Sequence, residues 1–394
     1  MLVNRLRRRL HPLLWHITVV DESQQHVYQP GLLMVPFGQL SSDQLTQPRS
    51  RFIPDGVELV YGQIDRVDTS ARLVRLTNGR RLAYDQLVIA TGVRPRPDQT
   101  PGMLGPQWRK SIFDFYTVDG AIALAEALRR LEHGRVVVHI AEMPIKCPVA
   151  PLEFAFLADA YFRERGMRDR IELVYATPLP AAFTKPVAAQ QLGDLLDEKK
   201  IQLEPDFVVE RIDPEAKLLV SYDGREVPFD LLVTVPVNMG GDYLARSGLG
   251  NELNCVPVDK RTFLAKGHKD IFALGDVADL PTSKAGSVAH FSVDVFVDNF
   301  LRHIAAAPMT ENFDGHANCF VETGDGKALL LDFDYDTEPL PGHFPLPVIG
   351  PFPLLRESRL NHWGKRAFRW VYWNLLLPGR LPHRRKGNDH HHGG

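Results

Sequence analysis

The sequence predicts an α/β protein built from two doubly wound parallel sheets, followed by a smaller C-terminal segment of strands and one helix. Three observations support this fold class. Apolar strands alternate with segments of helical spacing between residues 111 and 245, which is typical of a parallel sheet covered by helices. A short strand near the start ends in an acid, and a later strand ends in Gly-Asp.

Composition narrows the class of protein. The chain has 394 residues, enough for two or three domains. Its formal net charge of -2 argues against nucleic-acid binding. Three cysteines in so long a chain cannot form a disulfide scaffold, and they favour a cytoplasm-facing protein with a working redox pair. No apolar run approaches the ~20 residues that cross a bilayer.

The first predicted unit begins with an amphipathic helix in residues 1–14 and a strand over 16–22. In a dinucleotide-binding fold, the acid that closes the second strand hydrogen-bonds the adenosine ribose, so Asp21 is the candidate for that role. The first strand and its glycine-rich turn should stand upstream of this helix, and residues 1–20 contain no glycine. We therefore expect the first strand and glycine-rich turn to be missing, because of either a late start or the loss of the pyrophosphate-binding turn.

The turn over residues 143–153 is the most informative stretch. An apolar strand precedes it and a helix follows, as at a nicotinamide-binding turn, which needs glycine so that the backbone can approach a pyrophosphate. This turn instead has no glycine, three prolines and Cys147. A thiol at a helix N-terminus, one residue after Lys146, is expected to favour its reactive thiolate. The alternative is a small buried hydrophobic cysteine.

Three short motifs together resemble one family. They are residues 144–151, the strand end Ala90-Thr91-Gly92, and Leu274-Gly275-Asp276. The chain resembles the sulfide:quinone oxidoreductases and the related flavocytochrome c sulfide dehydrogenases over roughly residues 16 to 380. The resemblance implies an FAD enzyme whose second dinucleotide-type domain has lost nicotinamide binding, with sulfide and quinone as substrates.

The resemblance also implies roles for individual residues. Cys147 and Cys319 match the two redox cysteines, and Glu153 matches the acid assigned to proton transfer. Cys255 falls where the family has no catalytic residue and is expected to be structural. No metal site is expected. The residues expected to contact FAD are Asp21, Ala90, Thr91, Gly92, Gly275, Asp276 and Lys284.

The expected chemistry uses a disulfide between the two cysteines. Hydrosulfide attacks it, one cysteine becomes a persulfide, and the other is freed as a thiolate that delivers an electron pair to the flavin. The expected domains are residues 1–110 with 246–308 for FAD, 111–245 for the second domain, and 309–394 for the C-terminal segment.

The C-terminus suggests where the electron acceptor binds. Between Arg356 and Lys386 there are nine lysines and arginines against one acid, interleaved with aromatic residues. An apolar stripe of Leu360, Trp363, Ala367, Trp370 and Val371 faces away from Lys365, Arg366 and Arg369. This pattern favours an interfacial helix that lets quinone reach the flavin; the alternative is an ordinary docking helix. We expect a peripheral, monotopic protein on the cytoplasmic or periplasmic face of a bacterial inner membrane, with a homo-oligomer as a candidate assembly. A short tail, His390–His392, is assigned to disorder or an added tag.

Two other functions stay open. A type II NADH:quinone oxidoreductase shares the expected fold and membrane helix, but it is disfavoured because the second turn lacks glycine. A truncated, FAD-less scaffold or persulfide carrier is favoured by the missing glycine-rich motif.

Overall fold

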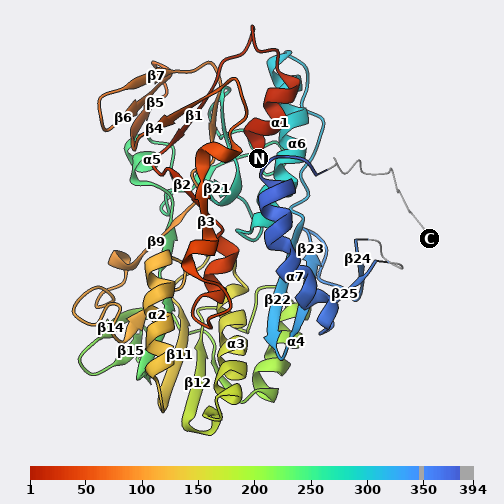
Figure 1. The fold of residues 1–394 in the computed structure, drawn as a ribbon. Helices are drawn as coiled ribbons and strands as arrows, with labels where there is room; N and C mark the ends of the chain where they lie inside the picture. Colours follow the sequence, from red (N-terminus) through yellow and green to blue (C-terminus); the bar gives the residue numbers. More distant parts are fainter. Residues whose placement is uncertain (346–349, 382–394) are drawn as a thin grey trace.

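The computed structural model describes residues 1–345 and 350–381, in which two α/β bodies are joined side by side and a C-terminal hairpin and helix lie along one flank (Figure 1). The histidine tail lies outside the described residues. The predicted α/β class is confirmed. No helix among the described residues is long and apolar enough to cross a membrane.

The first body contains two pairs of parallel strands. Strand β1 (Ile17–Asp21) pairs with β4 (Val57–Tyr61), and β8 (Leu87–Ile89) pairs with β20 (Ile271–Ala273). Within residues 1–345 and 350–381, no strand joins the two pairs into one sheet. Helix α1 (Leu2–Arg9) packs on α6 (Gly286–Ile304) beside these strands.

The second body is a five-stranded parallel sheet with the order β10-β17-β11-β12-β13. All side chains of β17 are buried, and so are most of those of β11 and β12, because helices cover the sheet. This explains why the predicted strands read as continuous β-branched runs. The elements are β10 (Ile112–Phe113), α2 (Val118–Arg130), β11 (Gly134–Ile140), α3 (Ala150–Glu164), β12 (Ile171–Ala176), α4 (Pro186–Glu198), β13 (Ile201–Glu204) and β17 (Leu231–Val235).

Smaller elements complete the two bodies. Antiparallel three-stranded sheets form from β5 (Ile64–Asp68), β6 (Leu73–Leu76) and β7 (Arg81–Ala83), and from β14 (Val209–Asp213), β15 (Leu218–Ser221) and β16 (Glu226–Pro228). Besides short 3-10 turns, the two bodies also contain β2 (Gln25–Val27), β3 (Thr46–Pro48), β9 (Arg94–Arg96), β18 (Val237–Met239), α5 (Asp242–Arg246), β19 (Val256–Pro257) and β21 (Ala278–Asp279).

The C-terminal segment packs against the second body. Strands β22 (Ala317–Gly324) and β23 (Lys327–Phe333) form a hairpin whose first strand lies on α3. Helix α7 (Arg359–Val371) packs on β23 and continues as a π-helical turn over Tyr372–Leu376. Strands β24 (Gly342–Phe344) and β25 (Phe352–Leu354) pair beside it.

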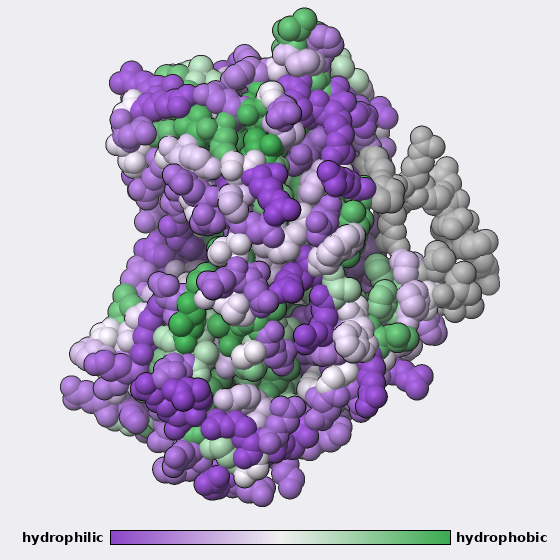
Figure 2. All heavy atoms as spheres, in the orientation of Figure 1, coloured by the Kyte–Doolittle hydropathy of each residue, from purple (hydrophilic) through white to green (hydrophobic). Residues whose placement is uncertain are grey.

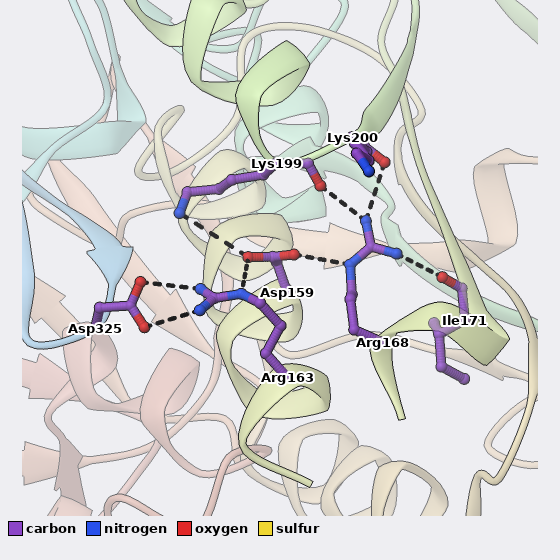
Figure 3. Close-up of polar contacts among 7 residues, drawn as sticks. All are labelled: Asp159, Arg163, Arg168, Ile171, Lys199, Lys200 and Asp325. Atoms are coloured by element: carbon purple, nitrogen blue, oxygen red, sulfur yellow. Dashed lines mark hydrogen bonds and ion pairs between the residues drawn. The ribbon is translucent and has the colours of Figure 1, made fainter. Parts of the chain in front are cut away.

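One ion-pair network fixes the hairpin to the far end of α3 (Figure 3). The buried carboxylate of Asp159 accepts from Arg163 at 2.9 Å and from Arg168 at 2.7 Å, and Lys199 lies 3.9 Å away. Arg163 also pairs with Asp325 in the hairpin turn at 3.0 Å. The network therefore sets the register between α3, which follows the Cys147 turn, and β22, which carries Cys319.

Candidate functional site

Backbone contacts from both bodies hold the Cys147 turn. The amide of Cys147 donates to the Lys284 carbonyl at 2.6 Å, and the amide of Lys146 donates to the buried side chain of Asn238 at 3.1 Å. Cys147 itself has φ 47°, a left-handed conformation uncommon for a residue with a side chain. Such local strain persists where the surroundings fix the backbone, and it is frequent at functional sites.

The environment of the Cys147 thiol differs from the sequence-based expectation. We expected the helix N-terminus and Lys146 to favour the thiolate, and this is wrong for the structure described. Burial raises the pKa of Cys147 to about 12, and the nearby Glu153 carboxylate raises it further, while Lys365 opposes the shift. The desolvation of a buried thiolate therefore outweighs the local positive charges.

Cys319 lies opposite Leu331 in the β22–β23 hairpin and is partly exposed, as is Cys147. Both are free thiols. Burial raises the pKa of Cys319 well above its usual value, and the neighbouring Cys147 adds to this shift. The two thiols, 172 positions apart in the chain, are thus brought close enough for the charge on one to act on the other. Cys255 is buried, with its thiol 3.9 Å from the Asp276 carbonyl.

Glu153 lies on the first turn of α3 and is almost completely buried. Its carboxylate accepts from the amide of Glu322 at 2.7 Å and from the Lys365 ammonium. Burial raises the pKa of Glu153, and the charge of Lys365 opposes this effect. The side chain faces β22 and α7, so Glu153 is not a solvated glutamate at the start of a helix.

The Gly-Asp loop lies next to the Cys147 turn. Burial raises the pKa of Asp276, and the charges of Lys146 and Lys284 oppose the shift. The Lys284 ammonium donates to the carbonyls of Asp276 at 2.6 Å and Ala278 at 3.3 Å, so it braces the loop. The Asp276 carboxyl group thus lies between two cations at the edge of the thiol centre.

The Ala90-Thr91-Gly92 turn follows β8. Gly92 has φ 67°, and a side chain built there would meet open space. Ala90 is exposed. The Thr91 hydroxyl lies 3.0 Å from that of Tyr243. At the other edge of this body, Asp21 pairs with Arg49 at 3.0 Å and accepts from the Ser23 amide at 2.9 Å. Asp21 is therefore already engaged by protein groups.

Sequence reasoning missed the polar residues that surround the two thiols. Lys365 was expected on the polar outer face of the C-terminal helix, but its side chain is 13% exposed and points to Glu153. His362 binds Glu322 at 2.9 Å one turn earlier. The available signal was spacing, since Asn361, His362 and Lys365 fall away from the apolar stripe, although spacing alone does not say which face meets the protein.

This fold and this thiol centre define a flavoprotein disulfide reductase. Residues 5–294 match the family model described as pyridine nucleotide-disulphide oxidoreductase, and the chain belongs to that family.

Curated relatives and a solved structure narrow the resemblance. The chain is 24% identical over 386 residues to the mitochondrial sulfide:quinone oxidoreductase of Mus musculus, covering 96% of this chain and 84% of the relative. It is 25% identical over 370 residues to the corresponding protein of Dictyostelium discoideum, with 92% and 80% covered. The crystal structure of the sulfide:quinone oxidoreductase from Aquifex aeolicus superposes with a TM-score of 0.78 at 20% identity, over 97% of this chain and 89% of that one. The expected resemblance to the sulfide:quinone oxidoreductases is confirmed.

The chain is accordingly an FAD-dependent oxidoreductase. The residues around Asp276 fit such a cofactor. Gly92 borders open space, and the Asp276 carboxyl group, which makes no hydrogen bond to another described side chain, is a suitable acceptor for a ribityl hydroxyl. The Arg49-bound Asp21 makes a weaker case, and its ribose role stays a prediction.

Proposed function

We propose that this protein oxidises hydrogen sulfide through Cys147 and Cys319 and passes the electrons to a quinone. The observation that supports the proposal is that Cys147, in the turn before α3, and Cys319, on β22, lie near enough for the charge on Cys147 to act on Cys319, with Glu153 acting on both thiols. A dithiol beside a flavin loop is the arrangement that accepting an electron pair from a sulfur substrate requires.

The proposed cycle uses a disulfide between the two cysteines. Hydrosulfide attacks one sulfur of the disulfide, the S–S bond breaks, and one cysteine becomes a persulfide while the other leaves as a thiolate. Transfer of the outer sulfur to an acceptor nucleophile restores the second thiol. Loss of two electrons and two protons from the dithiol then restores the disulfide.

Within this cycle, the chain's own residues handle protons and position. The Glu153 carboxylate, held by the Glu322 amide and Lys365, accepts the thiol proton. Asp276, Thr91, Gly92 and the Lys284 loop would hold FAD. FAD, when bound, supplies the two-electron acceptor that quinone reoxidises.

We further propose that α7 lies on a membrane surface, which makes the protein peripheral and monotopic. The apolar stripe faces outward: Leu360 is 56% exposed, Trp363 64% and Trp370 62%. Arg359 and Arg366 of the same helix are also exposed. Figure 2 shows apolar side chains over the region of α7 and β25, beside the atoms drawn in grey. Tryptophan with flanking arginine suits a headgroup layer with anionic lipid.

The proposed domains are those expected from the sequence, with residues 1–110 and 246–308 forming the FAD unit. The separation of the β1–β4 pair from the β8–β20 pair supports the expectation that the described FAD unit lacks a central strand. The truncated, FAD-less carrier rests on the same feature, but the family assignment weighs against it.

The experiment that tests the function compares two reductants. The purified flavoprotein is mixed under anoxic conditions with sulfide or with NADH, and flavin absorbance near its oxidised maximum is followed. Bleaching by sulfide and not by NADH is expected. Bleaching by NADH alone would favour the NADH:quinone oxidoreductase, and a protein without flavin absorbance would favour the carrier.

A further inference from the structure

Helix α7 contacts the segments around the two thiols through the ammonium group of Lys365. The Lys365 ammonium donates to the Glu153 carboxylate and, at 3.2 Å, to the carbonyl of Phe320. Glu153 follows Cys147 by six positions, and Phe320 follows Cys319 directly. One side chain of the outer helix therefore contacts both elements that carry the thiols.

A second contact closes this arrangement into a network. His362 binds the Glu322 carboxylate at 2.9 Å, and the Glu322 amide donates to Glu153 at 2.7 Å. The side chains of Glu153 and Glu322 are each 2% exposed, so their charges are poorly screened by water. Helix α7, α3 and β22 are thus locked together at the thiol centre.

The charges in this centre are unbalanced without Lys365. Burial raises the pKa of both thiols, the carboxyl groups of Glu153, Asp276 and Asp332 raise the pKa of one or both further, and the charge of Lys365 opposes this shift for both. Burial would lower the pKa of Lys365 itself, but Glu153 and Glu322 outweigh burial and raise it. Lys365 therefore keeps its charge next to the thiols.

We propose that Lys365 is a positioning residue of the dithiol centre, by which α7 holds the Glu153 carboxylate in place and sustains the reactivity of both Cys147 and Cys319. The inference rests on the proposed function for its place in the cycle. The helix that faces outward with Trp363 and Trp370 also provides, on its inner face, the charge on which the thiols depend.

The test measures thiol reactivity directly and needs neither sulfide nor quinone. The fully reduced holoenzyme is treated with iodoacetamide at fixed neutral pH, and the alkylation of each cysteine is followed by peptide mass spectrometry. Alkylation is slow relative to proton exchange, so its rate follows the equilibrium thiolate fraction, which changes about tenfold for each unit of thiol pKa.

Two variants should move this rate in opposite directions. Lys365→Met leaves Glu153 unmatched and is expected to slow alkylation of both thiols about tenfold or more. Glu153→Gln removes the opposing charge and is expected to accelerate both, while the double variant returns towards the wild-type rate. A purely structural role would move both single variants in the same direction.

Cys255 serves as the internal reference for folding, because it is 2% exposed; burial raises the pKa of its thiol, and the cation that opposes this shift is Lys284 and not Lys365. Alkylation of Cys255 should stay slow in every folded variant. If Cys255 reacts in a variant, that variant is compared only under conditions in which Cys255 no longer reacts. Unchanged rates at Cys147 and Cys319 in Lys365→Met, or slowing in Glu153→Gln, would overturn the proposal. If sulfide does not bleach the wild-type flavoprotein, but Lys365→Met still slows alkylation and Glu153→Gln still accelerates it, the result counts against the proposed function alone.

Discussion

The amide of Cys147 donates a hydrogen bond to the carbonyl of Lys284 at 2.6 Å, although the two residues belong to different α/β bodies. The same Lys284 uses its ammonium to brace the Gly-Asp loop through the Asp276 carbonyl. The candidate redox turn and the candidate flavin loop are therefore one connected piece of backbone. A displacement of either segment moves the other.

The first prediction concerns the cysteines. Cys147→Ser and Cys319→Ser each remove one partner of the proposed disulfide, so sulfide-dependent flavin reduction should be abolished. Anoxic stopped-flow absorbance measures it. Cys255→Ser is the matched control and should retain the wild-type rate, because Cys255 is buried and takes no part in the proposed disulfide. Wild-type activity in either of the first two variants would end the proposed mechanism.

A second prediction concerns cofactor affinity. Asp276→Asn replaces one of the two carboxyl oxygens with an amide nitrogen that cannot accept a hydrogen bond, so the Kd for FAD should rise roughly tenfold to hundredfold. Fluorescence titration of the apoprotein with FAD measures the change. Asp279→Asn, an exposed neighbour in the same loop, is the control. Equal affinity of the two variants would remove Asp276 from the cofactor site.

Features of the fold could be predicted from the sequence where local residues determine them, and could not where distant segments do. The strands β11, β12 and β17 could be predicted from their apolar sequences, because strands buried on both faces are apolar throughout. The pKa of the Cys147 thiol could not be predicted from the local sequence. Lys146 and the helix start are visible in the sequence, but the burial that outweighs them comes from distant segments.

Lys365 shows the same limit on a helix. Helical spacing separated it correctly from Leu360, Trp363 and Trp370, and the apolar stripe proved exposed. Spacing did not reveal that the opposite face meets a carboxylate 212 positions earlier in the chain. The pairing of Lys365 with Glu153 results from tertiary packing, so no local sequence pattern predicts it.

A third prediction concerns the network that registers α3 against the hairpin. Asp159→Asn leaves the charges of Arg163, Arg168 and Lys199 without their shared acceptor, and breaking a buried ion pair should lower the free energy of unfolding by roughly 2–4 kcal/mol. Urea unfolding followed by circular dichroism tests this. The exposed neighbour Asp169, changed to Asn, should alter stability little; equal stabilities would show that the network contributes no net stabilisation.

A fourth prediction concerns lipid. The double variant Trp363→Ser/Trp370→Ser removes the two largest exposed side chains of α7, so binding to vesicles of anionic phospholipid should weaken about tenfold or more. Co-sedimentation with vesicles measures the affinity. Tyr222→Ser removes an aromatic residue that is 73% exposed on the second body, and it should bind as wild type does. If both variants retain full binding, α7 is not the membrane contact.

The last prediction concerns pH and stability. His139 is completely buried, and burial lowers its pKa to about 3, whereas an unfolded histidine titrates near 6.5. Between these values the unfolded chain binds the extra proton, so the free energy of unfolding falls as the pH drops from about 6.5 towards 3. His139→Gln removes this dependence. When the pH is lowered from 7.5 to 5, the free energy of unfolding of the variant should therefore fall by about 2 kcal/mol less than that of the wild type. Urea unfolding at the two pH values measures the difference, with the exposed His11→Gln as control. A parallel loss in His139→Gln and wild type would mean that His139 is not held neutral by the fold.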